Sequence, residues 1–208
     1  MPFPTFENLP EEKKKRIIDA AMDEFSENSY NAASLNRIVK AAGISKGSLY
    51  QYFADKRDLY FFLLDRIAQE KLKLVQKTAR DASHASFFEV LGLVLQTALE
   101  LARTKPRYAL IANRMLDDRQ VEEEVLQRYG SSSDSFFQPL LARAIQQGEV
   151  KGDLDIELVS KLLTACMLAT GEYMIEKHGE YNEREAEKLF HSLFDLFENG
   201  LKRRGSGE

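Results

Sequence analysis

The sequence is poor in the residues that form cross-links and tight turns. It has a single cysteine, Cys166, in 208 residues, so neither an internal disulfide nor a cysteine-rich zinc site is expected. Proline and glycine are also scarce, at 5 and 11 residues, and alternating strand-like runs and hairpin signals are hard to find. Alanine, leucine, glutamate and lysine are abundant, so the predicted fold class is all-α.

Long apolar runs are missing as well. The longest one lies between Lys161 and Glu172, which is shorter than the about 20 residues that cross a bilayer. Residues 1–16 have no continuous apolar core of the kind found in secretory signals. We therefore expect a cytoplasmic protein without a membrane partner.

No pattern typical of catalysis or metal binding is present. His84, His178 and His191 are scattered and lack a partner four residues away. A nucleophile–base pair and a phosphate-cradling glycine loop are absent too. Cys166 lies in an apolar run, which is more typical of a buried core residue than of a redox sensor. We expect no catalytic residue, metal or cofactor, so an enzyme is the weakest hypothesis.

Charge is unevenly distributed along the chain. The formal net charge is -4, yet residues 30–57 hold five basic residues and one acidic residue. These are Arg37, Lys40, Lys46, Lys56 and Arg57 against Asp55. Residues 13–16 add four more cations. Such a local basic region on an acidic protein indicates a confined DNA contact, with an ordinary solvated charged face as the alternative.

The stretch from residue 43 to residue 53 combines a break with a short helix. Gly43 can adopt the positive φ that ends a preceding helix, and Ser45 can cap the next one. Ile44 and Leu49 have the spacing of a hydrophobic staple, and Leu49 and Phe53 would face inward. Lys46, Gly47, Ser48, Tyr50 and Gln51 then form an outer face without a carboxylate. This face suits a polyanion such as DNA.

Apolar periodicity predicts the remaining helices. Pro10 and the acidic residues after it predict a first helix over residues 9–28, and Ser34 is a candidate N-cap for a second helix that ends at Gly43. Further helices are predicted at residues 56–80, 86–103, 106–116, 121–147, 154–177 and 183–202. Gly130 and the three serines after it favour an interruption of the 121–147 helix. The second and third helices form a helix-turn-helix.

Residues 16–64, about a quarter of the chain, resemble the DNA-binding domain of the tetracycline-repressor (TetR) family of bacterial transcription regulators. The motif residues occur in the family's order: Ala21, Phe25, Tyr30, Ser34, Ile38, Ala42, Gly43, Ile44, Ser45, Gly47, Tyr50, Tyr52, Phe53, Lys56 and Leu59. One departure is Ser29, where the family usually has glycine. The difference concerns local turn geometry and leaves the helix pair unaffected.

The resemblance implies roles for individual residues, mostly as phosphate contacts. Together with the charge and capping patterns it gives a predicted DNA-binding set: Ser34, Arg37, Ser45, Lys46, Gly47, Ser48, Tyr50, Gln51, Tyr52 and Lys56. Tyr52 has two interpretations, because its ring could pack beside Phe53 or its hydroxyl could contact a phosphate. Lys56 follows the candidate N-cap Asp55, so a helix N-terminus and a cation could meet one phosphate.

The resemblance also implies a larger helical domain for effector binding and dimerisation. We assign residues 1–55 to the helix-turn-helix domain and residues 56–208 to this second domain. Its last two helices carry wide apolar stripes: Leu158, Leu162, Ala165 and Ala169 on one, and Leu189, Phe190, Leu193, Phe194 and Phe197 on the other. Each stripe could serve a core or a partner, and the resemblance implies that these helices form the interface of a homodimer. Candidate effector contacts are Tyr108, Arg114, Met115, Phe136, Phe137, Met167, Glu172, Tyr173 and Met174.

The leading hypothesis is a homodimeric repressor that binds a near-palindromic operator and is released by an unknown small-molecule effector. The alternative is a helical ligand-binding module or protein-interaction scaffold without specific DNA binding. Selective enrichment of one DNA sequence would separate the two.

Overall fold

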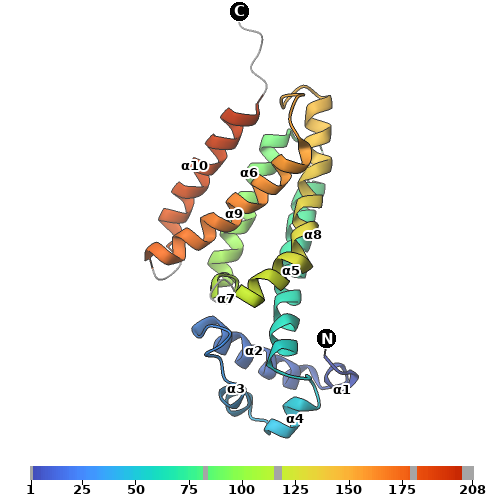
Figure 1. Ribbon diagram of the computed structural model, residues 1–208, viewed down its shortest axis with the longest axis vertical. Helices are drawn as coiled ribbons and strands as arrows, with labels where there is room; N and C mark the ends of the chain where they lie inside the picture. Colours follow the sequence, from blue (N-terminus) through green and yellow to red (C-terminus); the bar gives the residue numbers. More distant parts are fainter. Residues whose placement is uncertain (1, 82–83, 115–118, 179–181, 203–208) are drawn as a thin grey trace, which may run out of the picture. The chain divides into compact units, whose positions relative to one another are not determined.

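The computed structural model describes residues 2–81, 84–114, 119–178 and 182–202, and it is built from α-helices (Figure 1). In chain order these are α1 (Pro4–Glu7), α2 (Glu11–Glu27), α3 (Leu35–Ala42), α4 (Lys46–Tyr50), α5 (Lys56–Asp81), α6 (Phe87–Thr104), α7 (Pro106–Arg114), α8 (Arg119–Gln146), α9 (Ile156–His178) and α10 (Glu183–Leu201). The described residues contain no β-strand, only an isolated antiparallel bridge between Val150 and Lys202. The all-α prediction is confirmed.

Most helix boundaries lie within a few residues of the predicted ones, with two differences. Helix α1 precedes the predicted first helix and was not expected. Helix α8 runs without a break through residues 130–133, and it also contains Pro139. A glycine inside a helix costs about 1 kcal/mol relative to alanine, whereas a helix end leaves four backbone groups to be paired elsewhere. Composition alone is therefore a poor guide to a break.

The chain forms two compact units. Unit 1 comprises Met1–Glu70 and Lys105–Glu123, and unit 2 comprises Lys71–Thr104 and Glu124–Glu208. Helices α5 and α8 each contribute to both units. Unit 1 thus extends past residue 55 and includes α7, while the assignment of function to residues 1–55 and 56–208 stays a prediction.

Aromatic side chains hold α1 inside unit 1. The ring of Phe6 is 1% exposed and lies 4.9 Å from the ring of Phe53 and 5.4 Å from that of Phe62. The backbone N–H of Phe3 donates to the carbonyl of Tyr52 at 2.8 Å, just after α4. Tilted and edge-on aromatic pairs at these distances add stability beyond the buried area. Helix α1 therefore fastens the end of α4 to α5.

Two arginines attach α7 to α2 within unit 1. Arg107 donates from Nη1 to Asp23 at 2.7 Å and forms an ion pair with Asp19 at 3.4 Å. Arg114 donates from Nε to the backbone carbonyl of Ser26 at 2.8 Å. Arginine suits this role because its planar group presents several donors in a fixed arrangement. Helix α7 is thus fixed to the first long helix of unit 1.

Unit 2 has its own apolar core. Buried side chains from α6, α8 and α9 meet there, together with Val150 and Leu201. Four α10 residues pack against this core while remaining half-buried: Phe190, Leu193, Phe194 and Phe197. The apolar stripe predicted on α10 is thus used largely inside the subunit.

The turn between α3 and α4 has the predicted construction. Gly43 adopts φ 65° and ψ 39°, the left-handed conformation that glycine tolerates best. Ser45 is the N-cap of α4, and its hydroxyl accepts the N–H of Ser48 at 3.0 Å. Leu49 and Phe53 are each 1% exposed, as expected for the inward side. The sequence signals at these positions are confirmed.

We predict that Gly43→Ala will lower the free energy of unfolding by about 1–2 kcal/mol, because an L side chain must then occupy the left-handed region. A Cβ at this position would meet no atom within 4 Å, so the cost comes from the backbone alone. Urea denaturation followed by circular dichroism measures it. The matched control is Gly47→Ala, where a Cβ would meet only Ser45 Oγ at 3.9 Å. Equal losses in both variants would contradict the backbone explanation.

Candidate nucleic-acid interface

Helix α4 presents an exposed face without a carboxylate. Lys46, Gly47, Tyr50 and Gln51 are exposed on it, and Ser48 is half-buried. The backbone at Gly47 does not require glycine, since its φ is not positive and an added Cβ would have ample room. An exposed position without a side chain lets another backbone approach closely. This arrangement fits a surface that meets a phosphate backbone.

Tyr52 belongs to the core rather than to this face. Its side chain is 5% exposed, its ring lies 6.1 Å from that of Phe6, and the ammonium of Lys13 lies 5.6 Å from its centroid. Of the two interpretations that the sequence left open, the structure supports packing. Because its side chain is buried, we do not propose Tyr52 as a DNA contact.

Lys56 is occupied inside the protein. Its ammonium donates to three backbone carbonyls, those of Tyr30 at 2.7 Å, Ala33 at 3.1 Å and Asn31 at 3.3 Å. It also lies 4.7 Å from the centroid of the Tyr30 ring. An ammonium has three N–H donors, so none is left for a phosphate in this arrangement. The structure thus gives Lys56 a different role from the predicted phosphate contact: it holds the segment between α2 and α3.

Ser34 and Arg37 are linked through Glu24, which is not among the predicted site residues. Glu24, in α2, is 7% exposed and accepts the backbone N–H of Ser34 at 2.8 Å. The same carboxylate accepts Nε of Arg37 at 2.9 Å and Nη2 at 2.5 Å. Ser34 is the N-cap of α3 by position, as predicted, but its side chain makes no capping hydrogen bond. Residue type and spacing do not predict this role of Glu24, because the sequence around it contains several other charged residues.

Burial and hydrogen bonding act in opposite directions on Glu24. Burial alone would raise the pKa of its carboxyl, but hydrogen bonds from Arg37 and Ser34, with the charges of Arg37 and Lys56, hold the pKa below its usual value. Glu24 is therefore ionised at neutral pH. The local charge of +4 counted from residues 30–57 thus includes one cation that is neutralised by α2.

Two lysines of the helix-turn-helix are exposed. Lys40 and Lys46 make no ion pair with any residue in the described ranges. Arg57, by contrast, lies 5.6 Å from the centroid of the Phe61 ring. Lys40 and Lys46 are thus the lysines of α3 and α4 that can meet a polyanion without breaking an internal ion pair.

The candidate effector residues do not form one cluster. Tyr108 belongs to unit 1, where its hydroxyl donates to Glu70 at 2.7 Å and Lys105 pairs with the same carboxylate. Hydrogen bonds from Lys105 and Tyr108 hold the pKa of Glu70 below its usual value. Arg114 also belongs to unit 1, in which it binds α2. These two residues have structural roles, so they are withdrawn as ligand contacts.

The remaining candidates lie in unit 2 or outside the described residues. Phe137 is buried in the core, Phe136 and Met167 pack against it, and Tyr173 is 46% exposed. Met115 lies outside the described residues, as do the side chains of Glu172 and Met174. A groove of about 960 Å³ in unit 2 is lined instead by other residues, among them Phe88, Leu93, Glu149, Phe194 and Lys202. The helical spacing of apolar residues therefore did not predict the residues that line this groove.

The described residues contain neither a metal-binding cluster nor a membrane-spanning helix. No group of three or more His, Cys, Asp or Glu side chains is placed to hold a metal ion. No helix in the described ranges is long and apolar enough to cross a membrane. Cys166 is half-buried on α9.

Comparison with known proteins relates this chain to bacterial regulators. Residues 17–61 match the family model for bacterial regulatory proteins of the tetR family. A TetR family transcriptional regulator from Chloroflexus aurantiacus J-10-FL is 32% identical in sequence, with a TM-score of 0.69 over 98% of this chain and 100% of that chain.

Two further relatives carry names connected with fatty acids. The fatty acid metabolism regulator protein of Bacillus subtilis (strain 168) is 25% identical over 194 residues, which are 91% of this chain and 95% of that protein. A crystal structure of the transcriptional regulator FadR from Bacillus subtilis in complex with stearoyl-CoA has 25% identity and a TM-score of 0.71, over 89% of this chain and 98% of that chain.

We predict that Lys56→Ala will destabilise the protein by about 2 kcal/mol, since three carbonyls lose their donor. Lys56→Met should destabilise the protein by a similar amount, because methionine keeps the aliphatic stem but has no hydrogen-bond donor. Urea denaturation gives both values. Lys40→Ala is the control and should leave stability unchanged within about 0.5 kcal/mol, as expected for an exposed side chain. A stable Lys56→Met variant would show that the three hydrogen bonds contribute little.

Proposed function

Because this chain belongs to the TetR family of bacterial transcriptional regulators, we propose that it is a homodimeric repressor released from its operator by a small molecule. The observation that carries the proposal is the α3–α4 pair, with its left-handed turn at Gly43 and the exposed face of Lys46, Gly47, Tyr50 and Gln51. In this geometry α4 enters the major groove, and Lys46 and the hydroxyls of Ser48 and Tyr50 meet phosphates and base edges. The operator lies in the cytoplasm, which is therefore the proposed compartment.

The proposed DNA contacts are fewer than the sequence suggested. They comprise Ser34, Arg37, Ser45, Lys46, Gly47, Ser48, Tyr50 and Gln51. Lys46, Ser48 and Gln51 are the members that we propose for sequence choice, since each can bond to a base edge. Lys46 also contacts a phosphate, and the other members position the protein on the backbone.

The proposed dimer uses the last two helices. Helix α9 carries an exposed apolar stripe that includes Leu158 and Leu162, which are 53% and 49% exposed, and Tyr173. Ala165 and Ala169 lie on the same stripe and are exposed as well. Leu196 of α10 is 65% exposed. A second copy of the chain would cover these side chains, and the resulting two-fold axis would space two α4 helices about one DNA turn, roughly 34 Å, apart.

The proposed effector is a long-chain acyl-CoA. Support comes from the two fatty-acid-related relatives, of which FadR was crystallised with stearoyl-CoA. Such a ligand would act by a population shift: it binds more tightly to the dimer whose α4 helices are wrongly spaced and so lowers operator affinity.

We predict that selection from a random DNA pool will enrich a near-palindromic site with half-sites about 10 base pairs apart. Lys46→Ala should weaken binding to this site and to random DNA, and reduce the slope of log affinity against log salt by about 0.9, one phosphate contact. Fluorescence anisotropy over a salt series measures both quantities.

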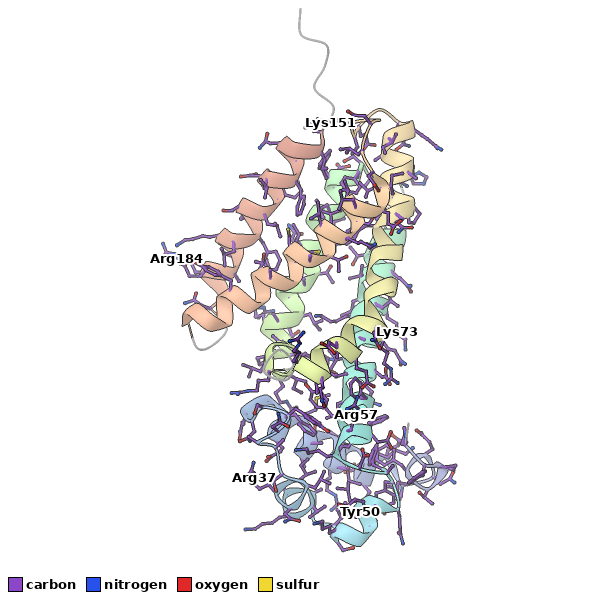
Figure 2. The ribbon with its side chains drawn as sticks, viewed as in Figure 1. Arg37, Tyr50, Arg57, Lys73, Lys151 and Arg184 are labelled. Atoms are coloured by element: carbon purple, nitrogen blue, oxygen red, sulfur yellow. The ribbon has the colours of Figure 1, made fainter. Side chains whose placement is uncertain are left out.

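The control for this experiment is Lys73→Ala, which removes an exposed lysine of unit 2 (Figure 2). It should leave the slope unchanged. An unchanged slope for Lys46→Ala would remove that residue from the phosphate contacts. A pool without enrichment would favour the scaffold hypothesis.

We further predict that stearoyl-CoA will raise the midpoint of thermal unfolding and release the protein from the selected DNA, because it binds one folded state in preference. Free CoA and stearate serve as controls for the two halves of the ligand. Binding of stearoyl-CoA without DNA release would contradict its role as effector. Failure of all three to bind, with DNA binding intact, would exclude this ligand class and leave the repressor proposal standing.

A further inference from the structure

Glu24 holds the start of α3 through two separate groups. Its Oε1 accepts the backbone N–H of Ser34 at 2.8 Å, and its two oxygens together accept three hydrogen bonds from Arg37 at 2.5–3.0 Å. The two side chains come from different helices, α2 and α3. A charged pair of this kind with 7% exposure on the carboxylate side is costly unless its donors and acceptors are matched. Here they are.

Arg37 is only partly used by this contact. Its Nε and Nη2 face inward, and Nη2 also donates to the carbonyl of Ala32 at 2.9 Å. Nη1 donates to no residue in the part of the chain that the structure describes. A guanidinium has five N–H donors, so two remain for an external acceptor. The side chain is 56% exposed, and Figure 2 marks it on α3.

Arg37 and Lys56 are both cations, but only Arg37 keeps hydrogen-bond donors for an external acceptor. Lys56 spends its three donors on carbonyls of the chain. Arg37 can keep its inward hydrogen bonds and still donate a pair to a phosphate, because its donors point in two directions from one rigid plane. The hydrogen bonds made by Nε and Nη2 of Arg37 therefore fix the direction in which Nη1 points.

We propose that Glu24 is a positioning residue for DNA binding: it holds the Arg37 guanidinium so that the Nη1 donors face a backbone phosphate at the start of α3. This inference rests on the proposed DNA-binding function. A side chain that is ordered before binding loses less conformational freedom on binding, which is worth about threefold to tenfold in affinity for one long side chain.

The sign of the affinity change in a Glu24 variant distinguishes positioning from charge repulsion. A carboxylate near DNA repels phosphates, so its removal should raise affinity if charge alone decides. The proposal predicts the opposite sign for Glu24, because the loss of positioning outweighs the gain in charge. It also predicts an unchanged number of phosphate contacts, since Arg37 is still present.

The test measures affinity and salt slope for the selected DNA with the full chain. For Glu24→Gln we expect a threefold to tenfold loss of affinity with the slope unchanged. Arg37→Ala should lose affinity and reduce the slope by about 0.9. Glu27→Gln is the matched control: Glu27 is exposed on α2 and acts on Arg37 through charge alone, so its removal should leave affinity equal or higher.

Each outcome decides the proposal. Full affinity of Glu24→Gln, or an equal loss in Glu27→Gln, overturns the positioning role, and an unchanged slope in Arg37→Ala overturns the phosphate contact. Should Glu24→Gln or Arg37→Ala fail to fold, Arg37→Lys keeps the charge without the two-sided donor plane, and it must show lower affinity at an unchanged slope. If the wild-type protein and Lys46→Ala show no salt-dependent DNA binding, the proposed function has failed instead.

Discussion

The segment between α2 and α3 depends on side chains from three helices. Residues 28–34 lie outside regular helix, so their backbone groups need other partners, and buried ones cannot stay unpaired without cost. Lys56 of α5 supplies three donors to this segment, Arg37 of α3 supplies one, and Glu24 of α2 accepts the N–H of Ser34. Because these side chains are on different helices, pairing the segment also fixes the helices. The orientation of α3, and of α4 after Gly43, follows from this set of hydrogen bonds.

Features that depend on neighbouring residues could be predicted from the sequence. The left-handed glycine at position 43, the cap at Ser45 and the inward placement of Leu49 each involve residues at most four apart, so residue type and spacing contain the needed information. Helix periods fixed the long elements for the same reason. The exposed α9 stripe through Leu158 and Leu162 also follows from spacing, although periodicity could not say whether a core or a partner covers it.

Features that depend on distant residues could not be predicted. Glu24 and Arg37 are 13 residues apart and Lys56 and Tyr30 are 26 apart, so a count of charges cannot show that a carboxylate holds one cation and backbone carbonyls hold the other. The same limit explains the unexpected α1, whose Phe6 is buried against Phe53. It explains the misplaced ligand contacts as well, because an aromatic residue in a helical stripe has the same spacing in a core as in a pocket. Tyr108 shows this: its partner Glu70 lies 38 residues away.

The division of the chain constrains how a ligand could act on DNA binding. Control requires two arrangements of unit 1 that the ligand distinguishes. The chain passes between the units after Glu70, after Thr104 and after Glu123, and the first and last of these points lie inside α5 and α8. A continuous helix transmits a displacement better than a loop does. At the remaining point Lys105 is paired with Glu70, and α7 continues from it to the arginine contacts with α2. A displacement of α7 would therefore strain both its pair with Glu70 and its arginine contacts with α2. Asp23 and Ser26 flank Glu24 on α2, so these contacts lie next to the carboxylate that accepts hydrogen bonds from Arg37.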